Sequence, residues 1–135
     1  MGIQEVTPDM ERAKSLYKMA LDTYQMVQTI DGKKFPSNVI KEYYDIIRQF
    51  IDITLLLRGY KTFGEGAHEE AIALAHKEGT LNATEFFLAN ELRKKRNRMS
   101  YEGHAIEYSY VVRNKEAILQ LIHQLRTKIE KILEL

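Results

Sequence analysis

The stretch VIKEYYDIIRQFIDITLLL, residues 39–57, decides the fold class. Its apolar residues recur every three or four positions, which predicts a helix with one buried face. The members of this stripe are Val39, Tyr43, Ile46, Ile47, Phe50, Ile53, Thr54 and Leu57. The three leucines at its end widen the stripe, so we expect burial on more than one side. We expect the helix to follow Ser37 or Asn38 and to be closed by the glycines that begin at Gly59.

A second stretch with the same spacing lies before it, at residues 10–27. Apolar residues three and four positions apart again predict one apolar helix face. Thr7 or Asp9 is expected to cap the start of this helix, since both side chains can accept a backbone hydrogen bond. The pair Asp31-Gly32 is expected to end it.

Three more helices are predicted in the remainder of the chain. A short one spans about residues 67–77. The next opens at Asn82, where Glu85 three positions later predicts a capping box, and it breaks at Gly103. The last is expected from about residue 105 to the end of the chain.

Length and composition favour one globular domain. The chain has 135 residues, of which 44% are hydrophobic and 29% charged, typical of a soluble globular protein and unlike a disordered one. Nothing alternates with period two for more than a few residues. We therefore predict a single all-α domain over residues 1–135, an antiparallel helix bundle of four long helices plus one short helix.

Charge, cysteine content and hydropathy exclude several classes of protein. There are 20 Lys and Arg residues against 19 Asp and Glu, so any nucleic-acid site must rest on a local cluster. The absence of cysteine excludes disulfides, thiol catalysis and cysteine-based zinc sites. No apolar run approaches the ~20 residues of a membrane helix, and the first eleven residues lack a signal-peptide core. We expect a cytoplasmic protein with no membrane contact.

The strongest local feature is a basic segment at residues 93–98. Five of its six residues are cationic, and they are the candidate nucleic-acid-binding residues: Arg93, Lys94, Lys95, Arg96 and Arg98. One interpretation is a solvated helix end, which favours cations. The other is a site of phosphate contacts.

Other constellations of catalytic or ligating residues are weak. Glu65 and His68 have the Glu-x-x-His spacing of di-iron bundles, but such sites need two copies of it and the sequence has one. No phosphate-binding loop or nucleophile elbow occurs. We expect neither a metal nor a cofactor. The eight tyrosines are interpreted as packing residues, with stacking on nucleobases as the alternative.

Two segments together resemble the HEPN superfamily (higher eukaryotes and prokaryotes nucleotide-binding domains). The first is YDIIRQFIDITLLLRGYKTFGEGAH, residues 44–68, which is similar to the family's apolar helix, Gly-aromatic-Lys ending and following His. The second is LRKKRNRMSYEG, residues 92–103. It is similar to the family signature, an Arg and a polar residue followed by a His after four to six positions.

The resemblance implies a candidate catalytic set of Arg96, Asn97, Arg98, Tyr101 and His104. Arg96 and Asn97 match the family's Arg and polar residue, but Tyr101 stands where many members have His. A tyrosine ordinarily titrates near ~10, so it is a poor base at neutral pH. The alternative is a shifted motif, in which Arg98 stabilises phosphoryl charge and His104 transfers protons. We favour a degenerate motif.

The resemblance also implies partners. Family members commonly pair their motifs across a homodimer and are often encoded with a minimal nucleotidyltransferase, as a toxin–antitoxin pair. Three functions remain open. The first is a non-catalytic or weakly active module that binds RNA or nucleotide. The second is a metal-independent RNA endonuclease that uses Arg98 and His104. The third is a structural or interaction bundle.

Overall fold

The computed structural model describes residues 2–135, which form five helices and one sheet of two strands. The helices are α1 (Met10–Gln28), α2 (Pro36–Leu57), α3 (Ala67–Lys77), α4 (Ala83–Glu102) and α5 (Tyr108–Leu133), and the strands are β1 (Gly2–Glu5) and β2 (Tyr60–Phe63). The predicted predominance of helix is confirmed. None of the helices is both long enough and apolar enough to cross a membrane.

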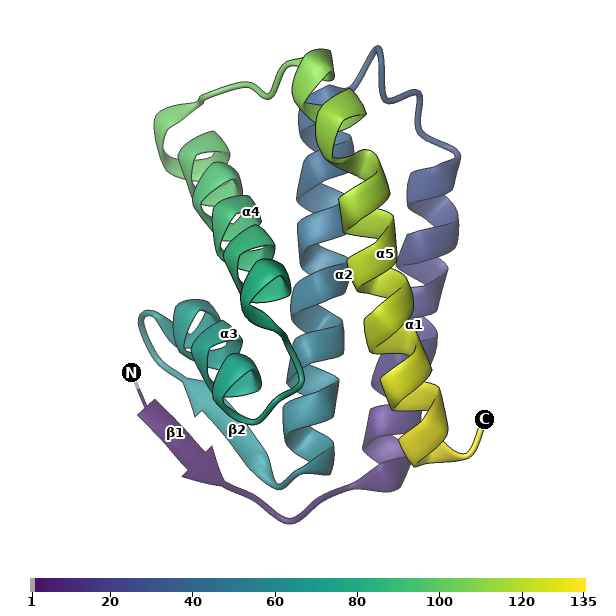
Figure 1. Ribbon diagram of the computed structural model, residues 1–135, viewed down its shortest axis with the longest axis vertical. Helices are drawn as coiled ribbons and strands as arrows, with labels where there is room; N and C mark the ends of the chain where they lie inside the picture. Colours follow the sequence, from purple (N-terminus) through teal and green to yellow (C-terminus); the bar gives the residue numbers. More distant parts are fainter. Residues whose placement is uncertain (1) are drawn as a thin grey trace.

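Helix α2 is the centre of the fold, and every other helix packs against it (Figure 1). Eleven of its 22 residues are buried, so the expected burial on more than one side is confirmed. One of them, Phe50, is completely buried. The stripe that predicted this helix therefore forms the core to which the rest of the chain attaches.

Helices α1 and α5 lie together against one side of α2. The ring centres of Tyr17 on α1 and Phe50 on α2 are 5.6 Å apart. The Tyr17 hydroxyl donates a hydrogen bond to the Glu130 carboxylate on α5. Burial and this bond raise the pKa of Tyr17 to about 12, so at neutral pH the phenol keeps the proton that it donates.

Helices α2 and α5 begin at the same end of the molecule and run in the same direction (Figure 1). The backbone N–H of Ile106 donates to the Ser37 Oγ at 2.7 Å, and the Ile106 side chain is buried. This anchored linker delays the start of α5 from the expected residue 105 to Tyr108. The predicted antiparallel arrangement does not describe the α2–α5 pair.

The helix starts follow the capping chemistry of the sequence. Asp9 caps α1, where its side chain accepts a hydrogen bond from the Arg12 backbone N–H at 3.0 Å. Asn82 and Glu85 form the predicted capping box of α4, with both hydrogen bonds at 2.8 Å. Helix α2 begins at Pro36, slightly earlier than expected, because proline is well suited to the first turn of a helix.

The sheet is the element that the all-α prediction lacks. Strands β1 and β2 pair antiparallel, with Gly2 opposite Phe63 and Glu5 opposite Tyr60. The pairing continues beyond the strands, since the Val6 N–H donates to the Gly59 carbonyl at 2.8 Å. Gly59 has φ +88°, and a Cβ there would lie 3.0 Å from the Val6 carbonyl oxygen. Glycine is therefore required where the chain leaves α2 and enters β2.

Candidate functional site

The basic segment, residues 93–98, lies in the second half of α4. The capping box fixes the start of this helix, and Gly103 ends it with φ +67°, a conformation that glycine adopts without strain. Consecutive residues on a helix are rotated by about 100°. The five cations of the segment therefore cannot share one face of α4.

These cations point in three directions. Lys94 and Arg98 are exposed to solvent. The Lys95 ammonium lies 5.0 Å from the ring centre of Tyr110, which places it against α5 in a cation–π contact. Arg93 and Arg96, three positions apart, reach acidic residues on α3 and α2. Among residues 2–135, only these last two form ion pairs with residues of other helices.

Arg93 and Arg96 keep hydrogen-bonding capacity in these contacts. Arg96 Nε lies 4.0 Å from Asp45 Oδ1, and Arg93 Nη2 lies 3.7 Å from Glu69 Oε1. Both distances are too long for hydrogen bonds. Arg96 Nε is buried without a hydrogen-bond partner among residues 2–135. Arg93 Nε donates to Asn90 Oδ1 at 3.2 Å and Arg96 Nη1 donates to Ser100 Oγ at 3.1 Å. The other N–H groups of both guanidinium groups are donors for an incoming anion.

Beside Arg93 and Arg96, helices α2 and α3 contribute a tyrosine, a third arginine and a histidine. The rings of Tyr44 and His68 have their centres 6.4 Å apart. Arg48 lies one helical turn after Tyr44, and its charge acts on both rings. The Tyr44 hydroxyl is buried, and no residue of the described chain forms a hydrogen bond with it. We call Tyr44, Arg48, His68, Arg93 and Arg96 the Arg–His cluster.

The cluster shifts the pKa of both rings. Burial raises the pKa of Tyr44 to about 12 against the opposing effect of the arginines. Burial also lowers the pKa of His68 below its usual 6.5, and the charges of Arg48 and Arg96 lower it further. His68 is therefore neutral at pH 7 and able to accept a proton or a hydrogen bond.

A proton titration of His68 tests this environment. We expect its midpoint, followed by NMR, to lie below 6.5, and Arg96→Gln to raise it, because the substitution removes a neighbouring positive charge. Arg113→Gln on α5 is the matched control, since the main charges that shift the pKa of His68 are those of Arg48, Arg96, Asp45 and Arg93. Because folding lowers the pKa of His68, its contribution to stability is complete above pH 6.5 and is lost as the pH falls from 6.5 through the lower pKa of the folded state. If Arg96→Gln leaves the midpoint unchanged, the charge of Arg96 does not act on His68 and this description of the cluster is wrong.

The remaining candidate residues lie apart from the cluster. Asn97 is half-buried on α4. Tyr101 is 83% exposed, and His104 lies in the linker after α4 with its Nδ1 3.8 Å from a Glu102 carboxylate oxygen. Arg98 is also exposed. Within the described chain no hydrogen bond or ion pair joins Arg96 to any of these four.

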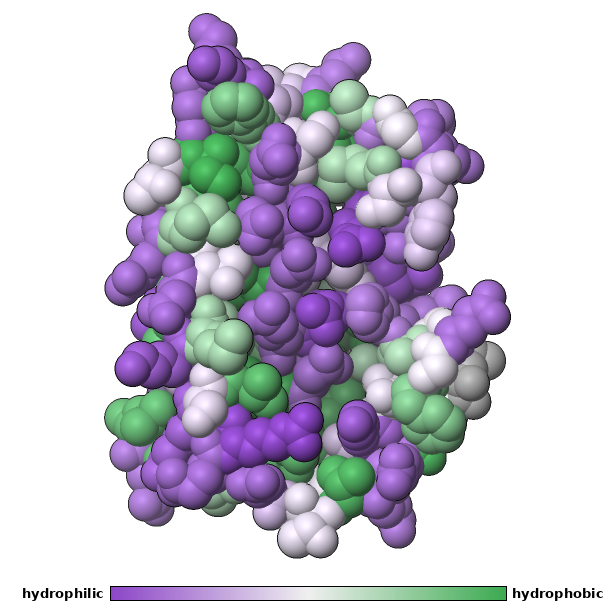
Figure 2. Space-filling view, turned by 180° about the vertical axis from the view of Figure 1, so that it is seen from behind, coloured by the Kyte–Doolittle hydropathy of each residue, from purple (hydrophilic) through white to green (hydrophobic). Residues whose placement is uncertain are grey.

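Sequence reasoning did not select Arg48, Tyr44 or His68 as a site around Arg96. A signal was present, because Asp45, Arg48 and Asp52 recur at helical spacing within the half-buried part of α2. Figure 2, the view from behind, shows a band of hydrophilic residues through the middle of the molecule with hydrophobic patches at its sides. A polar stripe on a central helix indicates a site more specifically than the basic segment does.

Comparison with known proteins does not assign the chain to a family. In the part of the chain that the structure describes, no three His, Asp or Glu residues gather to hold a metal ion. No protein-family model, curated protein or solved structure matches the chain.

Proposed function

We propose that this protein is a HEPN-like helical module that binds RNA or nucleotide through α4 and is non-catalytic or weakly active. The observation that supports this most is the Arg–His cluster, since Arg96 of the family-like motif meets Arg93, Arg48 and His68. Three guanidinium groups beside one neutral imidazole suit a phosphate group, because arginine offers several N–H donors in a fixed plane.

Two acidic residues beside the Arg–His cluster limit its affinity for a phosphate group. Asp45 and Glu69 lie at 4.0 and 3.7 Å from Arg96 and Arg93. A phosphate that binds must compete with both carboxylates. The competition is favourable where hydrogen bonds of normal length replace pairs that are too long to form them.

Replacing Arg96 tests the proposal. With a labelled single-stranded RNA oligonucleotide in EDTA, we expect Arg96→Gln to raise the Kd by about tenfold or more, since it removes a charged hydrogen-bond donor. Lys94→Gln combined with Lys95→Gln is the matched control. It should reduce only the salt dependence of binding, because these side chains contribute screened charge. Equal losses from both variants would indicate a diffuse basic surface in place of the cluster.

We propose a homodimer as the working form. Apolar side chains are exposed on both α1 and α5, namely Met26 at 42%, Val112 at 60% and Ile132 at 42%, and such surfaces are often buried against a second copy. Light scattering at micromolar concentration is expected to give twice the chain mass of 15.8 kDa. A mass of one chain under these conditions would contradict the dimer.

The endonuclease is retained as the second candidate. Arg98, Tyr101 and His104 are exposed near the end of α4, so they are accessible to a substrate and are not engaged in core packing. A nucleotidyltransferase partner and a cytoplasmic location belong to the same proposal through the family resemblance. A gene neighbour of that type would favour the proposed module over a purely structural bundle.

A further inference from the structure

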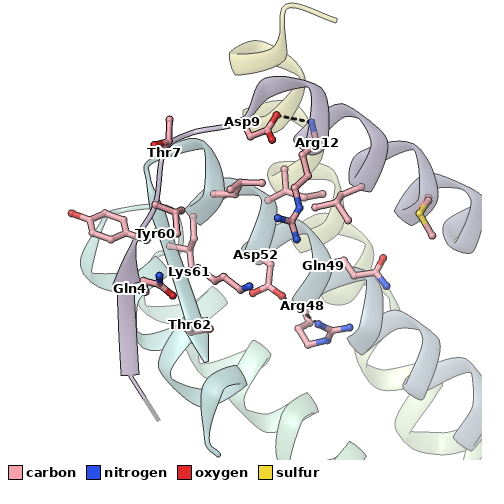
Figure 3. A pocket seen from close by; sticks show the side chains of 16 residues that line it. Gln4, Thr7, Asp9, Arg12, Arg48, Gln49, Asp52, Tyr60, Lys61 and Thr62 are labelled. Atoms are coloured by element: carbon pink, nitrogen blue, oxygen red, sulfur yellow. Dashed lines mark hydrogen bonds and ion pairs between the residues drawn. The ribbon is translucent and has the colours of Figure 1, made fainter. Parts of the chain in front are cut away.

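A pocket of about 520 Å³ lies between the sheet and the helix pair α1–α2. Its walls come from four parts of the chain: β1, the start of α1, the middle of α2 and β2. Figure 3 shows polar side chains from these elements pointing toward one another across the opening. The volume falls in the range of small-molecule sites. None of the residues of the basic segment lines it.

Three cations from three elements face this pocket. They are Arg12 of α1, Arg48 of α2 and Lys61 of β2, and Figure 3 shows Asp52 between them. Arg48 Nη1 donates to Asp52 Oδ2 at 3.2 Å. Arg12 and Lys61 have no ion-pair partner among the described residues. The pocket therefore holds two cations whose charge is not neutralised by a neighbour.

The two acidic residues of the pocket do not cancel this charge. Asp9 already accepts the hydrogen bond of the Arg12 backbone at the start of α1. Asp52 is paired with Arg48, and burial raises its pKa to about 6 although Arg48 opposes the shift. The remaining polar lining, which includes Gln4, Gln49 and Thr62, is neutral. An anion in this pocket meets Arg12 and Lys61 on different walls.

The rest of the lining is apolar. Leu16 and Met19 of α1 and Ile53, Leu55 and Leu56 of α2 contribute to it. Leu16 and Met19 are exposed at the mouth of the pocket, with 37% and 66% of their surface accessible. An apolar body placed against these side chains removes water from them. The pocket thus combines an apolar wall with separated cations.

We propose that this pocket binds a small organic anion, in which an apolar body carries a phosphate or carboxylate group. The apolar body lies against the aliphatic side chains of α1 and α2, and Arg12 and Lys61 hold the anionic group from opposite walls. Asp52 faces the ligand and limits its charge, because a second negative group would approach this carboxylate. The pocket shares Arg48 with the Arg–His cluster, and the other four residues of the cluster do not line it.

A pair of fluorescent probes tests this site. One is 8-anilinonaphthalene-1-sulfonate, an aromatic body with a permanent negative charge, and the other is N-phenyl-1-naphthylamine, the same body without the sulfonate. We expect the sulfonate to bind with one site per chain. In Arg12→Gln combined with Lys61→Gln, its Kd should rise about tenfold or more, while the Kd of the uncharged probe stays the same.

Two further variants distinguish the pocket from general effects of charge. Asp52→Asn is expected to tighten binding of the sulfonate, because it removes the negative group that faces the ligand. Lys33→Gln combined with Arg113→Gln removes two cations that do not line the pocket and should leave the Kd unchanged. Circular dichroism of each variant establishes that it is folded. Equal weakening by both double variants, or weakening by Asp52→Asn, would overturn the proposal.

Competition then identifies the anionic group. Phenyl phosphate and benzoate carry a phosphate and a carboxylate on the same ring. Displacement of the sulfonate probe by either supports the proposal. The competitor that displaces the probe at lower concentration identifies the preferred anionic group. Inorganic phosphate at equal concentration should displace far less, because it has no apolar body. Failure of both aromatic competitors, or equal displacement by inorganic phosphate, would contradict the assigned ligand class.

Discussion

Phe50→Ala is expected to lower the free energy of unfolding by about 3–5 kcal/mol, as measured by urea denaturation. Phe50 is completely buried in α2 and packs against Tyr17 of α1. Its removal leaves a cavity in the helix against which all the others pack. A domain of this size has about 5–15 kcal/mol of stability in total, so this one substitution should remove a large share of it.

The matched control is Phe87→Ala on α4. The Phe87 side chain is 70% exposed, and substitutions at such positions change stability by about 0.5 kcal/mol or less. The two variants delete the same atoms, so their difference measures the environment of each ring. Comparable losses from both would contradict the central position of α2.

The wild-type protein is expected to cleave RNA poorly or not at all near neutral pH in EDTA. Tyr101 stands where the family motif has its histidine, and loss of a general base costs about 10²–10⁴-fold in rate. Tyr101→His restores the family spacing from Arg96 and is expected to raise the rate. A time course with a labelled RNA substrate measures both proteins.

Three other variants test the alternative, in which the protein is an active endonuclease. If His104 is the base, wild type cleaves RNA in the presence of chelator, His104→Ala and Arg98→Ala are inactive, and Tyr101→Phe is nearly unchanged. That pattern would overturn the degenerate motif. His68→Ala belongs in the same assay, because His68 is the histidine on which the charge of Arg96 acts. Cleavage by wild type that disappears in His68→Ala would assign the base to α3.

The sequence predicted the helices because their signals are local. Val39, Ile46 and Phe50 repeat at helical spacing, and Asn82 with Glu85 carries its own cap. The sheet left no such signal, since each strand has only four residues and a period of two needs more to be visible. The late start of α5 depends on Ser37, which is far from Ile106 in sequence.

The candidate site was predictable only in part for the same reason. Arg93 and Arg96 are visible as part of a basic segment, but the segment does not show which cations turn inward. That choice is made by the packing of α4 against α2 and α3, which brings Asp45 and Glu69 to the two arginines. His68 joins them through the fold, at no fixed distance along the chain. Its neighbour Tyr44 was interpreted as a packing residue, which its burial agrees with.

The two-stranded sheet has a consequence for the motions of the protein. Each strand has a single partner, and α1 and α2 lie between β1 and β2 in the chain, so closing the sheet costs loop entropy. Four residue pairs of the sheet and the contacts of the strands with α2 and α3 offset this cost. A unit of this kind opens locally while the helices remain folded. Because both strands form walls of the pocket, each opening also dismantles it. If the pocket binds the proposed anion, the ligand is expected to slow hydrogen exchange at the backbone amides of β2. Ligand binding and local opening of β1 are then linked equilibria.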